Sequence, residues 1–219
     1  MSNPDHFFDE VNEEVRRERL KGAVSRYGWV AALAVLLIVG GAGVWEWRKH
    51  QARESAEAFG DEVIAALQAA DATARHGTLE AIAARETGGR RALAAMLAAD
   101  AATEAGEPAS AASTLAGVAG DSALAPAWRE LARLRQVIAS GDTMPEAERR
   151  AALDELSRPG APYRALALEQ VGLLEIASGD RETAMKTLRA LLQEPDVTPG
   201  LRRRASQLIV ALGGTLDAG

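Results

Sequence analysis

Two stretches of this chain repeat each other. The segment beginning at Arg91, RALAAMLAADAATEAGEPASAASTLAGVA, aligns without a gap on the segment beginning at Arg164, RALALEQVGLLEIASGDRETAMKTLRALL. Glycines then mark successive units of similar length: Gly106, Gly141, Gly179 and Gly213. Their spacing is close to the period of about 34 residues that is typical of stacked helix–turn–helix repeats, and it constrains the fold to a solenoid.

Each unit has the pattern of two short helices. The first is apolar and ends at the glycine, which can adopt the left-handed conformation that closes a helix. Turn-forming pairs follow, Glu107-Pro108 in the first unit and Asp180-Arg181 in the third, and a second helix starts there. The turn after Gly141 is longer, so the alignment does not fix where its second helix starts. We expect one more helix pair from Ala52 to about Arg85, and no strand.

A run without charge, Tyr27–Trp45, precedes the repeats. As a helix it would span about 28 Å, close to the hydrocarbon thickness of a bilayer. Aromatic residues that favour the headgroup layer stand at its two ends: Tyr27, Trp29, Trp45 and Trp47. A cleaved signal peptide fits less well, because the segment 1–26 precedes the run and six of its members are acidic. We therefore expect a transmembrane helix at 27–47 with these four aromatic residues at the membrane interface.

The charges beside the run predict its orientation. Five basic side chains precede it closely and three follow it, so the N-terminus is expected in the cytoplasm. This gives a cytoplasmic amphipathic segment at 1–26, the span at 27–47 and a periplasmic repeat domain at 48–219, in the inner membrane of a bacterium. The helix of the first segment is expected to start at Pro4. Its Phe7/Phe8 face either docks a partner or lies on the membrane surface, or the helix is partly frayed and only sets the topology.

Small residues stand where paired helices must approach closely. Gly172 and Ala184 lie seven before and five after Gly179, and Leu188 takes the large apolar place nine after it. Ala99, Ala111 and Leu115 have the same offsets from Gly106. This pattern resembles tetratricopeptide repeats, in a divergent form packed by alanine. The expected fold class is all-α: a cytoplasmic segment, one transmembrane helix and a tetratricopeptide-like α-solenoid.

The order of the parts carries a more specific resemblance. The tail SNPDHFFDEVNEEVRRERL, then RYGW, then WEWRKHQ and divergent repeats, is similar to alphaproteobacterial relatives of the ancillary SecYEG translocon subunit. The resemblance implies an accessory of the Sec translocon that also associates with periplasmic chaperones. The alternative is an assembly or structural factor of another envelope complex, in division, peptidoglycan synthesis or respiration. Mild-detergent copurification separates the two.

No catalytic or metal-binding pattern is expected. The chain has no cysteine, and its histidines, His6, His50 and His76, are scattered over the tail, a helix and a loop. GDRETAMKT lacks the spacing of a phosphate-binding loop. A net charge of −6 disfavours nucleic acid. We predict a binding protein with no cofactor rather than an enzyme.

The resemblance implies binding through a concave face lined by the first helix of each unit. Offsets from the glycines give its residues: Leu93, Met96, Asp100, Trp128, Leu131, Arg135, Leu166, Glu169 and Leu173. Trp128 and Arg135 are of the types that often anchor partners. For Trp128 a second interpretation is open, because a tryptophan just after Pro126 can also fill a gap in a core of alanines.

Overall fold

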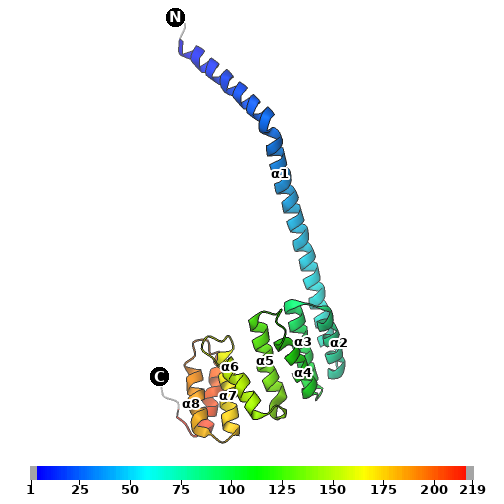
Figure 1. Ribbon diagram of the computed structural model, residues 1–219, viewed down its shortest axis with the longest axis vertical. Helices are drawn as coiled ribbons and strands as arrows, with labels where there is room; N and C mark the ends of the chain where they lie inside the picture. The colour runs from blue at the N-terminus through cyan, green and yellow to red at the C-terminus, as the bar shows by residue number, and fades with distance from the viewer. Residues whose placement is uncertain (1–3, 216–219) are drawn as a thin grey trace. The chain divides into compact units, whose positions relative to one another are not determined.

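The computed structural model describes the backbone of residues 4–215 and the side chains of Trp29, Val30, Leu33 and residues 36–215. Within this part every regular element is helical and there is no strand, which confirms the all-α expectation. The helices are α1 (Pro4–Leu67), α2 (Ala72–Arg85), α3 (Gly88–Glu104), α4 (Pro108–Ala119), α5 (Pro126–Ser140), the 3-10 turn η1 (Gly141–Thr143), α6 (Glu146–Leu156), α7 (Arg164–Ala177), α8 (Arg181–Leu192) and α9 (Pro199–Ala211) (Figure 1).

Two compact units divide the chain, one through Ala58 and one from Phe59 onward. The first is the larger part of α1, which begins at Pro4 as the sequence predicts. Its expected amphipathic face, with Phe7, lies outside the side chains that the structure describes. The second unit holds the end of α1 and all the other helices.

The predicted transmembrane helix is corrected by the structure. Within the described residues, no helix is long and apolar enough to cross a membrane. The earlier part of the predicted span falls largely outside the described side chains. The single-pass inner-membrane localisation, with its cytoplasmic N-terminus and periplasmic domain, is therefore not supported.

The four residues predicted for the membrane interface depended on that span, and no observation tests them directly. The side chain of Tyr27 lies outside the described residues. Those of Trp29, Trp45 and Trp47 are exposed on α1, and the Lys49 ammonium lies 4.8 Å from the centre of the Trp45 ring. An exposed indole beside a cation is accounted for by this local contact.

Helix pairs in the second unit follow the expected units. The glycines that end α3, α7 and α9 have positive φ, at 78° for Gly106, 84° for Gly179 and 85° for Gly213. This is the left-handed conformation that a side chain would strain, and the backbone N–H groups beyond it close the helix. After Gly141 the chain makes η1 before α6 begins at Glu146, so the longer turn of this unit is a short extra helix.

Small side chains set the spacing of paired helices, as predicted. Gly172 of α7 faces Leu188 of α8, and a methyl group added to Gly172 would lie 3.0 Å from Leu188 Cδ2. Ala99, Ala111 and Leu115 are buried in the corresponding pair α3 and α4. The absence of side-chain bulk at these places therefore lets the helices pack with a leucine between them.

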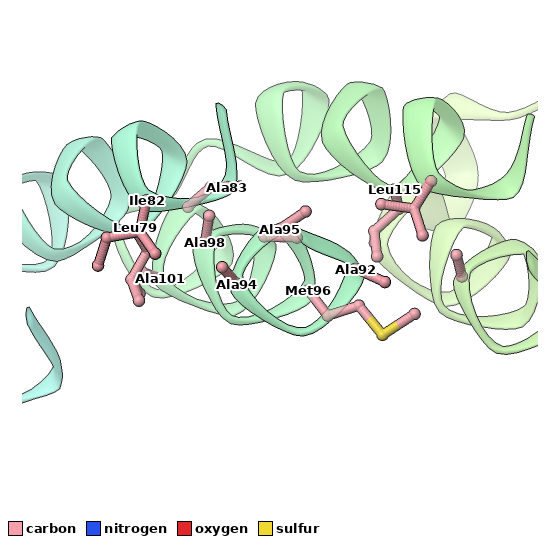
Figure 2. Close-up of a cluster of buried hydrophobic side chains, with 14 of the residues drawn as sticks. Leu79, Ile82, Ala83, Ala92, Ala94, Ala95, Met96, Ala98, Ala101 and Leu115 are labelled. Atoms are coloured by element: carbon pink, nitrogen blue, oxygen red, sulfur yellow. The ribbon is translucent and has the colours of Figure 1, made fainter. Parts of the chain in front are cut away.

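The interior of the second unit consists of three apolar clusters. The first extends from the end of α1 through α2, α3 and α4 to α5, and the alanines of α3 lie between Leu79 and Ile82 of α2 and Leu115 of α4 (Figure 2). The second joins α5, α6 and α7, and the third joins α7, α8 and α9, with larger side chains such as Leu191 and Ile209. Each helix pair therefore gains its core only by stacking on its neighbours.

Candidate protein-binding face

The predicted binding residues lie on three helices, α3, α5 and α7, and each of these helices ends at a repeat glycine. The predicted residues lie thirteen, ten and six positions before that glycine. The thirteenth and the sixth share a helix face, because a step of seven makes almost two turns. We call the exposed side of α3, α5 and α7 the first-helix face.

Leucines stand at the surface of this face in both outer helices. Leu93 of α3 and Leu173 of α7 are each 40% exposed, and Leu166 of α7 is exposed to a similar degree. Leu93 and Leu166 occupy matching positions in the two aligned segments. Large apolar side chains that recur at exposed positions of successive units form a surface suited to a protein partner.

Trp128 takes the place of Leu93 and Leu166 in α5, but it lies differently. It is partly buried and packs against the first core cluster. Its indole covers the start of α3, where a methyl group on Gly89 would lie 3.4 Å from Trp128 Nε1. The side chain thus fills space between α3 and α5, which is the second of the two interpretations that the sequence left open, while part of the ring stays accessible.

The residues ten positions before each glycine are buried or partly buried. Met96 is only 2% exposed, inside the first cluster, and Leu131 packs against that cluster. Glu169 is 6% exposed and accepts two hydrogen bonds from Arg204 of α9, at 2.7 Å and 2.8 Å. This position turns toward the neighbouring helix, so it joins first helices to each other and offers little surface to a partner.

An ion pair connects two other predicted residues across the face. Arg135 of α5 donates to the Asp100 carboxylate of α3, and both side chains remain accessible to solvent. Beside the pair lies a hollow of about 530 Å³, lined in addition by Glu104, Leu115 and Ile138. The offsets from the glycines thus lead to a charged centre of the face, whose role in binding stays a prediction.

Ile138 is a surface residue that the offsets from the glycines did not include. It is 52% exposed and lines both the first hollow and a second one of about 150 Å³, to which Gln170 and Leu173 contribute. It lies one turn after Arg135, so the helix period alone could have added it. The face thus presents these side chains: Leu93, Asp100, Arg135, Ile138, Leu166 and Leu173.

Arg204 is the second residue that sequence reasoning missed. Its hydrogen bonds with Glu169 raise the pKa of the guanidinium above its usual value. The signal was present in the repeat, because the alignment that places Met96 on Glu169 also places Leu131 on Arg204 when it is continued. The two aligned segments end before this position, so they do not include the match with α9.

Among the described residues, no group of three or more histidine, cysteine, aspartate or glutamate side chains could hold a metal ion. His76 lies in α2 rather than in a loop; its Nδ1 is 3.0 Å from the carbonyl oxygen of Ala98, and its Nε2 is 3.2 Å from Ser110 Oγ. These contacts join α2, α3 and α4 and give the buried ring a structural role.

Comparison with known proteins gives a family match over most of the chain. A family model described as a tetratricopeptide repeat-like domain matches residues 25–204. No curated protein and no solved structure matches the chain. The family match covers all the helices that form the first-helix face.

Proposed function

We propose, because this chain belongs to the tetratricopeptide repeat-like family, that it is a protein–protein interaction scaffold which binds its partner through the first-helix face. Repeats of this family commonly mediate contacts between proteins and typically act as scaffolds rather than catalysts. One observation carries the assignment to this face: exposed Leu93, Ile138 and Leu173 flank the Asp100–Arg135 ion pair beside two hollows.

The character of the face fits a protein segment better than a small molecule. Apolar side chains can bury the nonpolar side of a partner helix or loop, and the ion pair can orient it at the centre. Asp100 and Arg135 neutralise each other, so the face has no strong preference for a charged partner. We infer a partner segment with two apolar anchors that enter the hollows beside Ile138.

For the partner itself we propose a subunit of the Sec secretion channel or a chaperone that works with it. This finer proposal rests only on the resemblance of the N-terminal region and of the repeat pattern to the ancillary translocon family. An assembly factor of another envelope complex is the alternative, since the same face would serve it.

Site-specific photocrosslinking in the full chain tests both statements. A photoreactive residue at Ile138 or Leu173 is expected to crosslink one partner in cells, and the same residue at Ile64, which is equally apolar and exposed but outside the face, is not. Equal crosslinking from Ile64 and Ile138 would reject the face. A crosslinked secretion subunit or chaperone supports the finer proposal, whereas a division, peptidoglycan or respiratory protein supports the alternative.

A further inference from the structure

A further hollow, separate from the two beside Ile138, lies on the other side of α5. It has a volume of about 400 Å³ and is bounded by the end of α4, the first turns of α5 and the end of α6. Its α5 residues, Pro126, Arg129, Glu130 and Arg133, point roughly opposite to Arg135 and Ile138, as the helix period of about 100° per residue requires. A partner on the first-helix face would therefore leave this hollow free.

Positive charge gathers around the hollow although the chain as a whole is acidic. Three arginines line it, Arg129, Arg133 and Arg158, against two glutamates, Glu130 and Glu155. Arg133 donates one hydrogen bond to Gln136, and Arg158 donates one to the carbonyl oxygen of Glu155. Because a guanidinium has five N–H donors, both keep donors for a ligand.

Arg129 lines the hollow and has a polar atom without a hydrogen-bond partner. In the part of the chain that the structure describes, its guanidinium has no ion pair, and its Nε is buried without an acceptor. Next to it, the Glu130 Oε2 atom is buried without a donor. Buried polar atoms are almost always paired, and leaving them unpaired is unfavourable. The hollow thus lacks one acceptor near Arg129 and one donor near Glu130.

The two missing groups together define a ligand. A carboxylate supplies the acceptor, and guanidinium groups bind carboxylates with paired, charge-assisted hydrogen bonds. A peptide N–H beside that carboxylate supplies the donor, and a peptide residue also brings an apolar stem, which inorganic phosphate lacks. Ala116, Ala119 and Leu156 give the hollow an apolar wall for the stem of the residue. Its volume lies within the range of pockets that hold small ligands.

We propose that the hollow between α4, α5 and α6 binds one carboxylate-bearing residue of a partner peptide, with Arg129 as the principal contact. The carboxylate comes either from the C-terminus of the partner or from an aspartate or glutamate side chain. This is a binding site additional to the first-helix face, and it does not depend on the function proposed for that face.

Four N-acetylated dipeptides and one salt test the proposal on the full chain, with ¹⁵N-labelled backbone amides such as that of Gly120 as the readout. Acetyl-Leu-Glu-amide carries only a side-chain carboxylate, acetyl-Leu-Leu only a terminal one, acetyl-Leu-Glu both, and acetyl-Leu-Gln-amide none. We expect saturable shifts at the hollow for carboxylate-bearing peptides, at least tenfold weaker binding of the last peptide, and no competition by inorganic phosphate at equal concentration. The first two peptides identify the source of the carboxylate.

Substitution then localises the binding. Arg129→Gln is expected to weaken the best peptide roughly tenfold or more, whereas Arg203→Gln, on the exposed surface of α9, leaves it unchanged. Equal binding of the Gln-amide peptide, equal binding of phosphate, or equal loss in the two variants would each overturn the proposal. If Arg129→Gln does not fold, the comparison of acid and amide peptides on the unmodified chain still decides it.

Discussion

Two junctions between first helices use matching positions of the repeat: that between α3 and α5, and that between α7 and α9. The positions that hold apolar side chains in one junction hold charged side chains in the other. In the first, Met96 and Leu131 belong to the buried apolar side, and Asp100 and Arg135 form the outer ion pair. In the second, these positions form an ion pair between the buried Glu169 and the exposed Arg204. The outer places are taken by two leucines, Leu173 and Leu208.

This exchange shows that the repeat fixes where neighbouring helices meet but not how they are held. Both ion pairs join side chains that are 35 positions apart, and the two apolar pairs have the same separation. Each junction thus has one ionic pair and apolar side chains at its other two positions, so the two arrangements have a similar composition. The same backbone spacing therefore accepts either order, and the four predictions that follow test whether the two junctions are truly equivalent.

The largest effect is expected when the second junction's carboxylate is placed in the first. Met96→Glu puts a charge among apolar residues, with Leu131 where Arg204 would be needed, and should destabilise the fold by about 3–5 kcal/mol. Met96→Leu, which conserves volume, should cost less than about 1.5 kcal/mol. Urea unfolding of the full chain, followed by circular dichroism, measures both. A stable Met96→Glu protein would show that solvent reaches the side chain at position 96.

The two buried leucines of the second helices should be similarly costly to remove. Leu115 and Leu188 hold the same place in α4 and α8, and both are almost fully buried. Truncation of either to alanine should cost about 2–5 kcal/mol, because the cavity left behind closes only in part. Melting temperatures of the two variants, compared with that of the surface variant Leu166→Ala, measure this. A loss at only one of the two would break the equivalence of the units.

An intermediate effect is expected from removing the exposed arginine that pairs with the buried Glu169. Arg204→Leu leaves the Glu169 carboxylate buried without its donor and should cost roughly 1–3 kcal/mol. Adding Glu169→Met reproduces the Met96–Leu131 pair of the first junction and should return stability to within about 1 kcal/mol of the natural chain. A double-mutant cycle by urea unfolding gives the coupling. Additive losses would mean that the apolar arrangement does not fit the second junction.

The smallest effect concerns the start of the second helices. The Asp180 carboxylate caps α8 by accepting from the Thr183 N–H, which lowers its pKa, whereas Glu107 at the matching place makes no such bond. A lowered folded pKa contributes stability that is present above the unfolded value near about 3.9 and is lost as the pH falls through the folded value. Asp180→Asn should therefore flatten the dependence of the melting temperature on pH below about 4.

Glu107→Gln is the control for this measurement and should leave the fall of the melting temperature at acid pH unchanged. Asparagine still caps a helix, so Asp180→Asn is expected to melt near the natural temperature at neutral pH. An unchanged acid limb in both variants would show that the cap of α8 contributes nothing to the pH dependence.

Most of the fold of the repeat unit follows from the sequence. Helix ends at Gly106 and Gly179, close approach at Gly172 and burial of Leu188 are all encoded by local residue type, since glycine alone permits both the left-handed turn and the contact. The extent of η1 could not be foreseen, because no local signal distinguishes a long turn from a short helix there. The transmembrane prediction failed because it was drawn from one apolar run, and the structure supports no span within the residues it describes.

The binding face was predictable in outline only. Matching offsets placed Leu93, Asp100 and Arg135 on the surface, because exposure there depends on the helix period. They could not show that Met96 is enclosed, since its burial depends on α5 packing beside α3. The Arg129 hollow could not be predicted from the sequence. It forms where three helices of two neighbouring repeats meet, α4, α5 and α6, and residues so far apart in the chain share no sequence pattern.

The exchanged polarity also bears on how the array keeps its order while it folds. Similar repeats can stack on the wrong neighbour or trade places with those of another copy. If α3 were to meet α9 in place of α5, Met96 would face the Arg204 cation and Asp100 would face Leu208, so each ion pair would be broken. Mispaired arrays are thus penalised in both contacts, and the chain carries its own stacking order in the alternation of charged and apolar side chains along its first helices.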